Sequence, residues 1–488
     1  MKEHAIIILA HKDYTHVIRL IKYFSAECDV FIHLDLKSDF SSEEIQKIHQ
    51  LQNIKNVFCK YNVHWGGYSL LKCELHMIKA VLKSEKYKYI HVLSGQDYPI
   101  SPYHNFLDFF ENNNGKDYIQ YTRIPNKRWD HGTFSRLQYY SFYDYFKDRK
   151  KAQNINQKIK HIQERFHLKR RIPDEFDYLY GGSQWISIQT KTAQSLVEYT
   201  RKHPRFFKRM RFSFAPEEIY IPTVIVNTID RNRIIPFSRR FIRWKFENGN
   251  RPANLDERHF KFLLMSDCLF ARKFINGVSD NLIRLIDEYL LRDNEIAISP
   301  TGCWKYNGYI KYKFDEPFMR SLLFLCRSAN INSAIDFGCG SGLYVAMLRE
   351  KGISASGYDA NPFVSELSKR ILPDGDDVCE CADLTEDLEV EDSFDLVICK
   401  DVLYYIQSSY LNKVIKNLQK LTRHYLLFNW LERSETDVFG NVIENKSENE
   451  IISYFEQNGF SFNNGLSLIM RQQIKSDSDN KYYLFTKI

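Results

Sequence analysis

The hydrophobic pattern of the first half of the chain alternates short apolar runs with amphipathic segments. Runs rich in β-branched residues occupy Ala5–Ala10, Val30–Leu34 and Tyr89–Leu93, and such runs predict buried strands. The intervening segments His16–Phe24 and Leu70–Leu82 have the apolar spacing of helices. Strands that alternate with helices predict a parallel sheet, which binds ligands at the carboxyl ends of its strands.

A second alternation of the same kind occupies the end of the chain. Its first strand is expected at Ser333–Phe337, followed by the turn GCGSG and a helix, and SASGYD, FDLVIC and HYLLFNW continue the strands. A length of 488 residues suits two or three domains. The sequence therefore predicts two α/β domains, residues 1–293 and 294–488.

Composition excludes a disordered chain, and the charge is unevenly distributed. Hydrophobic residues make up 44% and charged residues 26% of the chain, with a net charge of +7, which is ordinary for a globular protein. Basic residues concentrate between Lys147 and Arg171, in a stretch that also has helical spacing. Two interpretations remain open for this stretch: a solvated helix face, or a surface for an acidic acceptor or an anionic membrane.

Cysteine spacing and hydropathy bear on the compartment. The ten cysteines have no metal-ligand or redox spacing, and the closest pair is Cys379 and Cys381, so we expect reduced thiols. The first apolar run is shorter than a signal peptide requires, and no window approaches the roughly 20 apolar residues that span a bilayer. The expectation is a cytoplasmic protein whose only membrane contact is peripheral, at the inner face.

The glycine-rich stretch AIDFGCGSGLYVAML lies between a predicted strand and a predicted helix. Glycines at 338, 340 and 342 allow positive φ angles and let the backbone contact a ligand, while the helix N-terminus offers free N–H groups. Taken alone, this loop fits a dinucleotide site or a structural turn that binds nothing.

The stretch resembles the first motif of the class I S-adenosylmethionine-dependent methyltransferases, D-x-G-x-G-x-G, which spans Asp336, Gly338, Gly340 and Gly342 here. A dinucleotide-binding fold normally has G-x-G-x-x-G instead. The resemblance extends to FDLVICKDVLYYI and covers about the last 190 residues, a usual domain size. It implies a Rossmann-like fold that binds S-adenosylmethionine.

The same resemblance assigns two further acids to the cofactor. Asp359, in SGYDANP, matches the position that pairs with the ribose hydroxyls, and Asp383, in CADL, matches the position beside the adenine. For Asp383 an ordinary turn acid is the competing interpretation. For a hydroxyl acceptor a general base would help, and Asp401, Tyr404 and His424 are candidates, although a structural role is the favoured interpretation of each.

The stretch HVLSGQDYPISP raises a different question. It reads as a buried strand that ends in a turn with a single carboxylate, Asp97. Sites that bind a nucleotide sugar through a metal commonly use paired carboxylates at such a position. Asp97 is therefore half of a metal site, an ordinary turn acid, or part of a site that neutralises the leaving group without a metal.

Several stretches of the first 290 residues together resemble one family, the core 2/I-branching N-acetylglucosaminyltransferases and peptide O-xylosyltransferases. In order, they are IIILAHKD, FIHLDLKS, VHWGGYSLLKCEL, HVLSGQDYPISP, GGSQWISI, APEE and LFARKF. The resemblance implies a GT-A-like fold that transfers GlcNAc or xylose from a UDP-sugar with inversion. It also implies that no metal is needed, which favours the third interpretation of Asp97, as a residue that orients the donor.

The family resemblance also assigns roles to individual residues. Its catalytic base is the last acid of S-P-D-E, which is Glu218 in APEE here, with Glu217 as a rival. Two cations replace the metal, because fixed positive charge stabilises the leaving diphosphate. The remaining assignments are Lys273, Arg272 and Arg251 to the diphosphate, Asp35 to the uridine, and Arg128 and Trp185 to the acceptor side.

Together, the two resemblances predict a bifunctional enzyme that adds a sugar to a glycan or lipid-linked glycan and methylates that glycan, in bacterial surface polysaccharide biosynthesis. One alternative is a glycosyltransferase with a non-catalytic cofactor-binding module. Another is a methyltransferase acting on nucleic acid or protein. We expect no nucleic acid partner, since the basic stretch lies in the first domain and no N/D-P-P-Y/F motif follows FDLVIC.

Overall fold

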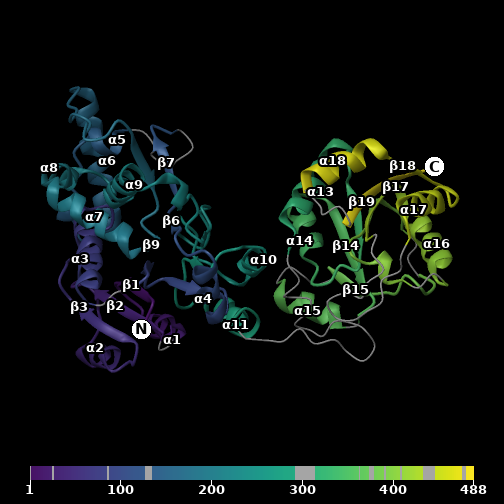
Figure 1. Ribbon diagram of the computed structural model, residues 1–488, viewed down its shortest axis with the longest axis horizontal. Helices are drawn as coiled ribbons and strands as arrows, with labels where there is room; N and C mark the ends of the chain where they lie inside the picture. The colour runs from purple at the N-terminus through teal and green to yellow at the C-terminus, as the bar shows by residue number, and fades with distance from the viewer. Residues whose placement is uncertain are drawn as a thin grey trace. The chain divides into compact units, whose positions relative to one another are not determined.

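The computed structural model describes residues 2–24, 27–84, 87–126, 134–291, 314–361, 363–372, 378–388, 392–406, 409–431, 446–474 and 480–488. The chain forms two compact units, Met1–Leu255 with Asp267–Asp280, and Asp256–Ser266 with Asn281–Ile488 (Figure 1). Each unit contains its own seven-stranded sheet, so the predicted class of two α/β domains is confirmed. The predicted boundary at residue 293 lies outside the described residues.

The sheet of the first unit is mostly parallel. Its order is β10 (Ile234–Ile235), β6 (Asp117–Tyr118), β9 (Ser187–Gln189), β4 (Tyr89–Ser94), β1 (His4–Ala10), β2 (Cys28–Leu34) and β3 (Ile54–Phe58). Strand β1 runs parallel to both β2 and β4, whereas β9 is antiparallel to β4. The carboxyl ends of β1, β2 and β4 therefore meet at one edge of the sheet.

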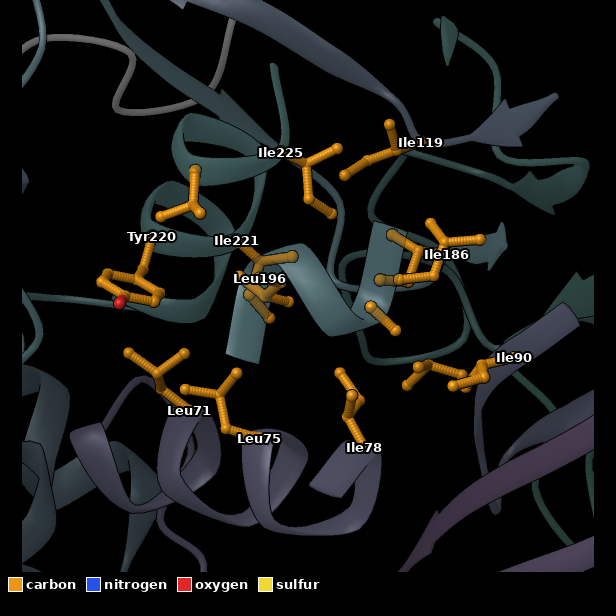
Figure 2. Packing of buried hydrophobic residues seen from close by; sticks show 14 of the residues in the cluster. Leu71, Leu75, Ile78, Ile90, Ile119, Ile186, Leu196, Tyr220, Ile221 and Ile225 are labelled. Atoms are coloured by element: carbon orange, nitrogen blue, oxygen red, sulfur yellow. The ribbon is translucent and has the colours of Figure 1, made fainter. Parts of the chain in front are cut away.

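Helices cover both faces of this sheet. They are α1 (Tyr14–Tyr23), α2 (Ser42–His49), α3 (Tyr68–Ser84), α4 (Tyr103–Asn112), α5 (Ser135–Gln138), α6 (Arg149–Arg165), α7 (Thr190–Lys202), α8 (Pro204–Arg209) and α9 (Glu217–Thr228). Helices α3, α7 and α9 form one core with the sheet, to which Leu75, Leu196 and Ile221 contribute (Figure 2). Helices α1 and α4 pack in the other core through Leu20 and Phe106. The first core fixes α9, whose first turn carries the predicted base.

A second, three-stranded sheet brings together segments that are far apart in the sequence, just beyond the carboxyl end of β4. Its order is β11 (Arg240–Ile242), β12 (Phe270–Arg272) and β5 (Asp97–Pro99). Strand β12 pairs antiparallel with β5, so that Arg272 lies opposite Asp97. A short ribbon of β7 (Tyr121–Ile124) and β8 (Leu179–Gly182) completes the strands of this unit.

The first strand of the second unit, β13 (Ser333–Phe337), lies in the interior of its sheet, third in the order. The order of this sheet is β15 (Cys379–Cys381), β14 (Ser354–Asp359), β13, β16 (Phe394–Cys399), β17 (Thr422–Leu431), β19 (Asn480–Lys487) and β18 (Phe460–Phe462). Strand β13 is parallel to β14 on one side and to β16 on the other. The strand order reverses at β13, and this is where open α/β sheets bind their ligands.

Among the described residues, eight α-helices are assigned to the second unit. They are α10 (Phe260–Leu264), α11 (Asp280–Tyr289), α13 (Glu316–Ser328), α14 (Leu343–Glu350), α15 (Phe363–Ile371), α16 (Leu411–Leu421), α17 (Glu448–Glu456) and α18 (Asn464–Ile474). Among the helices described in either unit, none has the length and apolar character needed to cross a bilayer.

Candidate active sites

Asp35 organises the loop that follows β2. It is buried, and its Oδ1 accepts hydrogen bonds from the backbone N–H groups of Lys37 at 3.0 Å and Val63 at 3.2 Å. Its own backbone N–H donates to the carbonyl of Ala10, at the end of β1, over 2.9 Å. Asp35 therefore joins the ends of two neighbouring strands, and its assignment to the uridine stays a prediction.

Asp97 and Arg272 form the centre of the site in the first unit. Asp97 is fully buried, and its Oδ2 accepts a hydrogen bond from the backbone N–H of Ser94 at 3.0 Å. The Nε of Arg272 lies 3.6 Å from Oδ1, and the guanidinium stacks 4.0 Å from the ring centre of Trp185. Burial raises the pKa of Asp97, and Arg272 is the main opposing influence. Three predicted residues are thus brought together.

Arg240 lies behind this group and was not predicted. It is buried, and it donates hydrogen bonds to Ser187 Oγ at 2.8 Å and to the carbonyl of Ile186 at 3.1 Å. Burial lowers its pKa to about 10, and Asp97 acts in the opposite direction. The sequence carries no signal for this residue, since only the pairing of β11 with β12 brings it toward Asp97.

Lys273 adds another cation to the site. Burial lowers its pKa to about 7, and Arg272, Arg149 and Lys12 lower it further, while Asp97 opposes them. Its carbonyl accepts a hydrogen bond from the backbone N–H of Leu255 at 2.8 Å. Cations thus outnumber acids around Asp97, and this arrangement suits an anionic ligand such as a diphosphate.

The other two predicted arginines are Arg251 and Arg128. Arg251 is exposed, and it follows a short bridge between Glu247 and Asn250. Arg128 is outside the described residues. Their assignments to the diphosphate and the acceptor remain predictions.

Glu218 and Glu217 stand at the start of α9 in different surroundings. Glu218 is partly exposed, at 28%, and its Oε2 accepts a hydrogen bond from Arg136 Nη1 at 2.6 Å. Glu217 is buried, and burial together with Glu218 raises its pKa to about 8. Glu74, on α3, is completely buried, and burial and Glu217 raise its pKa well above the ordinary value. Glu218 is therefore the accessible carboxylate of the three, and Arg136 and Glu74 are partners that sequence reasoning missed.

The loop that carries VHWGGYS packs against the APEE turn. The backbone N–H of Ala215 donates to the carbonyl of Gly66 at 2.9 Å. A Cβ on Gly67 would lie 2.2 Å from Asp144 Oδ1, so a larger residue here would displace the Asp144 side chain. Glu218 is also close enough to Arg272 to raise the pKa of its guanidinium, against the effect of burial. Both motifs and the Asp97–Arg272 pair thus belong to one site.

In the second unit the glycine loop has positive φ angles, which the glycines were expected to allow. Gly338, Gly340 and Gly342 have φ angles of 75°, 53° and 76°. A Cβ on Gly338 would lie 2.1 Å from Val402 Cγ2, and one on Gly342 would lie 2.6 Å from Cys379 Sγ. The loop therefore requires glycine at both positions.

Two buried acids flank this loop. Asp359, at the end of β14, accepts hydrogen bonds from the backbone N–H groups of Gly340 at 3.0 Å and Asn361 at 2.9 Å. Asp336 is buried, its Oδ1 has no hydrogen-bond partner among the described residues, and burial raises its pKa to about 8 against the influence of Lys400. An unpaired buried carboxylate beside a helix N-terminus suits a ligand with both cationic and anionic groups. These residues fit S-adenosylmethionine.

Asp383 is placed differently from the other predicted cofactor residues. It is exposed, and its Oδ1 accepts hydrogen bonds from both the backbone N–H and the hydroxyl of Thr385 at 2.8 Å. It therefore closes a local turn, and its contact with adenine stays a prediction.

The three candidate bases lie at opposite edges of the second sheet. Asp401 directly follows β16, at the edge of the glycine loop, and its Oδ1 accepts hydrogen bonds from Tyr404 OH at 2.8 Å and from Asn429. Lys400 Nζ donates to the other oxygen, and burial raises the pKa of Asp401. His424 is near the start of β17 and lies 3.9 Å from Asp395, at the opposite edge. Only the first two candidates are at the edge where the cofactor is expected.

No group of three or more His, Cys, Asp or Glu side chains is arranged to hold a metal ion in the described parts of the chain.

Family comparisons identify the classes of protein to which these two sites belong: a glycosyltransferase and a methyltransferase. The chain belongs to the Core-2/I-Branching enzyme family, whose model matches residues 5–265. A methyltransferase domain model matches residues 335–424. The predicted resemblances of both domains are thereby confirmed.

Individual relatives agree with the first assignment. The chain is 25% identical over 310 residues to xylosyltransferase sqv-6 of Caenorhabditis elegans, covering 59% of this chain and 36% of that protein. It is 21% identical over 313 residues to a mouse β-1,3-galactosyl-O-glycosyl-glycoprotein β-1,6-N-acetylglucosaminyltransferase 4, covering 58% of this chain and 64% of that protein. The chain thus spans about a third of the length of the xylosyltransferase.

Solved structures similar to this chain include S-adenosylmethionine-dependent methyltransferases. One, from Clostridium acetobutylicum, has 14% sequence identity and a TM-score of 0.30, and the match covers 36% of this chain and 93% of that chain. Another, magnesium protoporphyrin IX methyltransferase from Synechocystis, has 15% identity and a TM-score of 0.30 and covers 43% of this chain and 94% of that chain.

Proposed function

We propose that the first unit transfers GlcNAc or xylose from a UDP-sugar to a glycan hydroxyl with inversion and without a metal. Glu218 takes the proton of the acceptor hydroxyl while the acceptor oxygen bonds to the anomeric carbon. The bond to the diphosphate breaks, and its electron pair stays on the leaving oxygen. Arg272 and Lys273 stabilise that charge. The grouping of Glu218, Arg272 and buried Asp97 supports this proposal.

The environments of the two acids of APEE support the choice of base. Glu217 has a raised pKa of about 8, so it retains its own proton near neutral pH. It is therefore poorly suited to accept the proton of the acceptor hydroxyl. Glu218 is ion-paired with Arg136 over 2.6 Å and partly exposed, so an acceptor can reach it. A single displacement with this base gives an inverted product.

The second unit is proposed to methylate a hydroxyl of the same glycan. S-adenosylmethionine, when bound, supplies an electrophilic methyl group. Asp336 and Asp359, with the glycine loop, would hold it. Asp401 would take the acceptor proton, because burial raises its pKa, while Tyr404 and Asn429 fix its position.

The joint product is proposed to be a methylated glycan of a bacterial surface polysaccharide. A chain that joins both activities can add a sugar and block a hydroxyl of one acceptor. The test is incubation of the purified full chain with a glycan acceptor, UDP-GlcNAc or UDP-xylose, and methyl-labelled S-adenosylmethionine, with and without EDTA. We expect the sugar and the label in the glycan, with activity retained in chelator.

Three outcomes would contradict parts of this proposal. Complete loss of sugar transfer in EDTA would contradict metal independence. Sugar transfer without cofactor consumption would indicate a glycosyltransferase with a non-catalytic module. Label that appears only in protein or nucleic acid would replace the glycan as methyl acceptor.

A further inference from the structure

The helix α6 is attached to the first unit along one face. Its buried residues are Ala152, Asn156 and Gln163. Asn156 Oδ1 accepts a hydrogen bond from the backbone N–H of Phe142 at 2.6 Å, and Gln163 Oε1 accepts one from that of Tyr140 at 2.7 Å. These polar contacts fix which side of the helix faces the rest of the unit, and they therefore also determine which residues of α6 face outward.

The carboxyl-terminal end of α6 exposes large apolar side chains. Ile162 is 55% exposed, Phe166 is 65% exposed and Leu168 is 55% exposed. His167 has a positive φ of 52°, and the backbone N–H of Leu168 donates to the carbonyl of Gln163 at 2.8 Å, which is a defined helix-ending turn. Three neighbouring apolar side chains are thus held in solvent by ordered backbone, and such a patch commonly marks an interaction site.

Basic residues surround this apolar tip. Lys151, Lys158, Ile162 and Arg165 follow each other at helical spacings of seven, four and three residues, so they share one face of α6. Lys169 follows the tip and is also exposed.

The acids of this segment are engaged elsewhere. Glu164 lies 3.6 Å from Lys160 and 3.3 Å from His161, and Asp148 caps the amino-terminal end of the helix. Lys151, Lys158 and Arg165 have no carboxylate within ion-pair distance among the residues that the structure describes. The outer face is therefore positively charged and carries an apolar tip.

We propose that this surface, the α6 tip, docks the protein on an anionic phospholipid membrane. Apolar side chains flanked by Lys and Arg are what such a surface binds: the apolar groups enter the headgroup boundary and the cations contact lipid phosphates. A nucleic acid would use the cations but has no place for three exposed aliphatic and aromatic side chains. Docking through the tip requires no transmembrane segment.

The other end of α6 is part of the active site. Arg149, its first residue, stacks 4.0 Å from the ring centre of Trp65 and lowers the pKa of Lys273. A helix of 17 residues is about 25 Å long, so its carboxyl-terminal tip is separated from Arg149 by about that length. On the basis of the proposed function, this geometry favours a lipid-linked glycan as the sugar acceptor. The lipid of such an acceptor stays in the membrane while its sugar reaches Glu218.

The docking proposal is tested by sedimentation of the full chain with lipid vesicles. Vesicles of phosphatidylcholine alone are compared with vesicles that also contain phosphatidylglycerol, at low and high salt. We expect binding to the anionic vesicles at least tenfold stronger than to the neutral ones. The affinity of the double variant I162S/F166S for anionic vesicles should be at least tenfold lower than that of the unchanged chain. The affinity of K158A/R165A should also be lower, with a smaller difference at high salt than at low salt.

A matched control keeps the result specific. Phe246 is 72% exposed in another loop of the same unit, and Phe246→Ser should bind vesicles as the unchanged chain does. Circular dichroism of each variant verifies that it is folded. Equal binding to neutral and anionic vesicles, unchanged binding of I162S/F166S, or binding to duplex DNA but not to vesicles would each overturn the proposal.

Failure of the acceptor assignment can be separated from failure of docking. Sugar transfer to a water-soluble glycan measures the proposed function alone, and I162S/F166S should leave it unchanged. Vesicles that carry a lipid-linked glycan measure both. Docking with no preference for the lipid-linked acceptor would contradict only the acceptor class.

Discussion

The two sites differ in the balance of their buried charges. In the first unit Arg240, Arg272 and Lys273 surround a single central acid, Asp97. In the second unit the acidic residues Asp336, Asp359 and Asp401 outnumber the cation, Lys400, although burial raises the pKa of Asp336 to about 8. A positive surplus suits a diphosphate that gains charge as it leaves, whereas a negative surplus suits a positively charged methyl donor and a departing proton. Buried charge thus indicates which substrate each site accepts more directly than the fold, since both units are α/β.

The largest expected effect follows from removing the base of the first site. Glu218→Gln should lower sugar transfer about 10²–10⁴-fold, because the amide cannot accept the proton of the acceptor hydroxyl. Methyl transfer in the second unit should be unchanged. Glu217→Gln is the matched control and should have a much smaller effect. Steady-state kinetics of both variants decide, and a larger loss in Glu217→Gln would make Glu217 the base.

The ion pair of the first site should dominate its stability. Arg272→Met leaves Asp97 buried without its partner and should cost about 3–5 kcal/mol of unfolding free energy, measured by urea denaturation. Adding Asp97→Asn removes the uncompensated charge and should recover much of the loss. If the double variant is as unstable as the single one, packing against Trp185 rather than charge explains the effect.

The glycine loop offers a sharper test in the second site. Gly338→Ala would place a Cβ 2.1 Å from Val402 at a φ of 75°, and we expect at least tenfold weaker binding of S-adenosylmethionine by calorimetry. Gly352 also has a positive φ, of 82°, but nothing lies within 4 Å of its added Cβ. Gly352→Ala should cost roughly 1 kcal/mol of stability with unchanged cofactor binding. Equal cofactor affinity in both variants would show that close approach at Gly338 is unimportant.

The smallest effect concerns protonation of the first site. The pKa of Lys273 is lowered to about 7 by burial and neighbouring cations, and a bound diphosphate favours the charged amine. Above pH 7 the free enzyme must take up a proton to bind the donor, so affinity for the UDP-sugar should fall by up to tenfold per pH unit. Lys273→Arg, charged throughout, should flatten the profile. A pH-independent affinity in the unchanged chain would argue against a diphosphate contact.

Local motifs were predictable because strand, turn and glycine chemistry are encoded within a few residues. The run at Val30–Leu34 lies within β2, and the loop at Gly338 has its positive φ. Long-range pairing was not predictable: Arg240 and Arg136 approach Asp97 and Glu218 only through the folded sheets and loops. His424 was more predictable, since it is the first residue of the predicted strand HYLLFNW and lies near the start of β17, at the edge opposite the glycine loop.

The buried pair Glu74 and Glu217 makes the folding stability of the protein depend on pH. A carboxyl whose pKa rises to about 8 on folding from an ordinary 4.5 is protonated in the folded chain and ionised in the unfolded chain between these values. Stability from this group is therefore complete below about pH 4.5 and is lost progressively as the pH rises toward 8. Replacing Glu217 by Gln removes this dependence, so the variant should gain thermal stability relative to the unchanged chain as the medium becomes more alkaline.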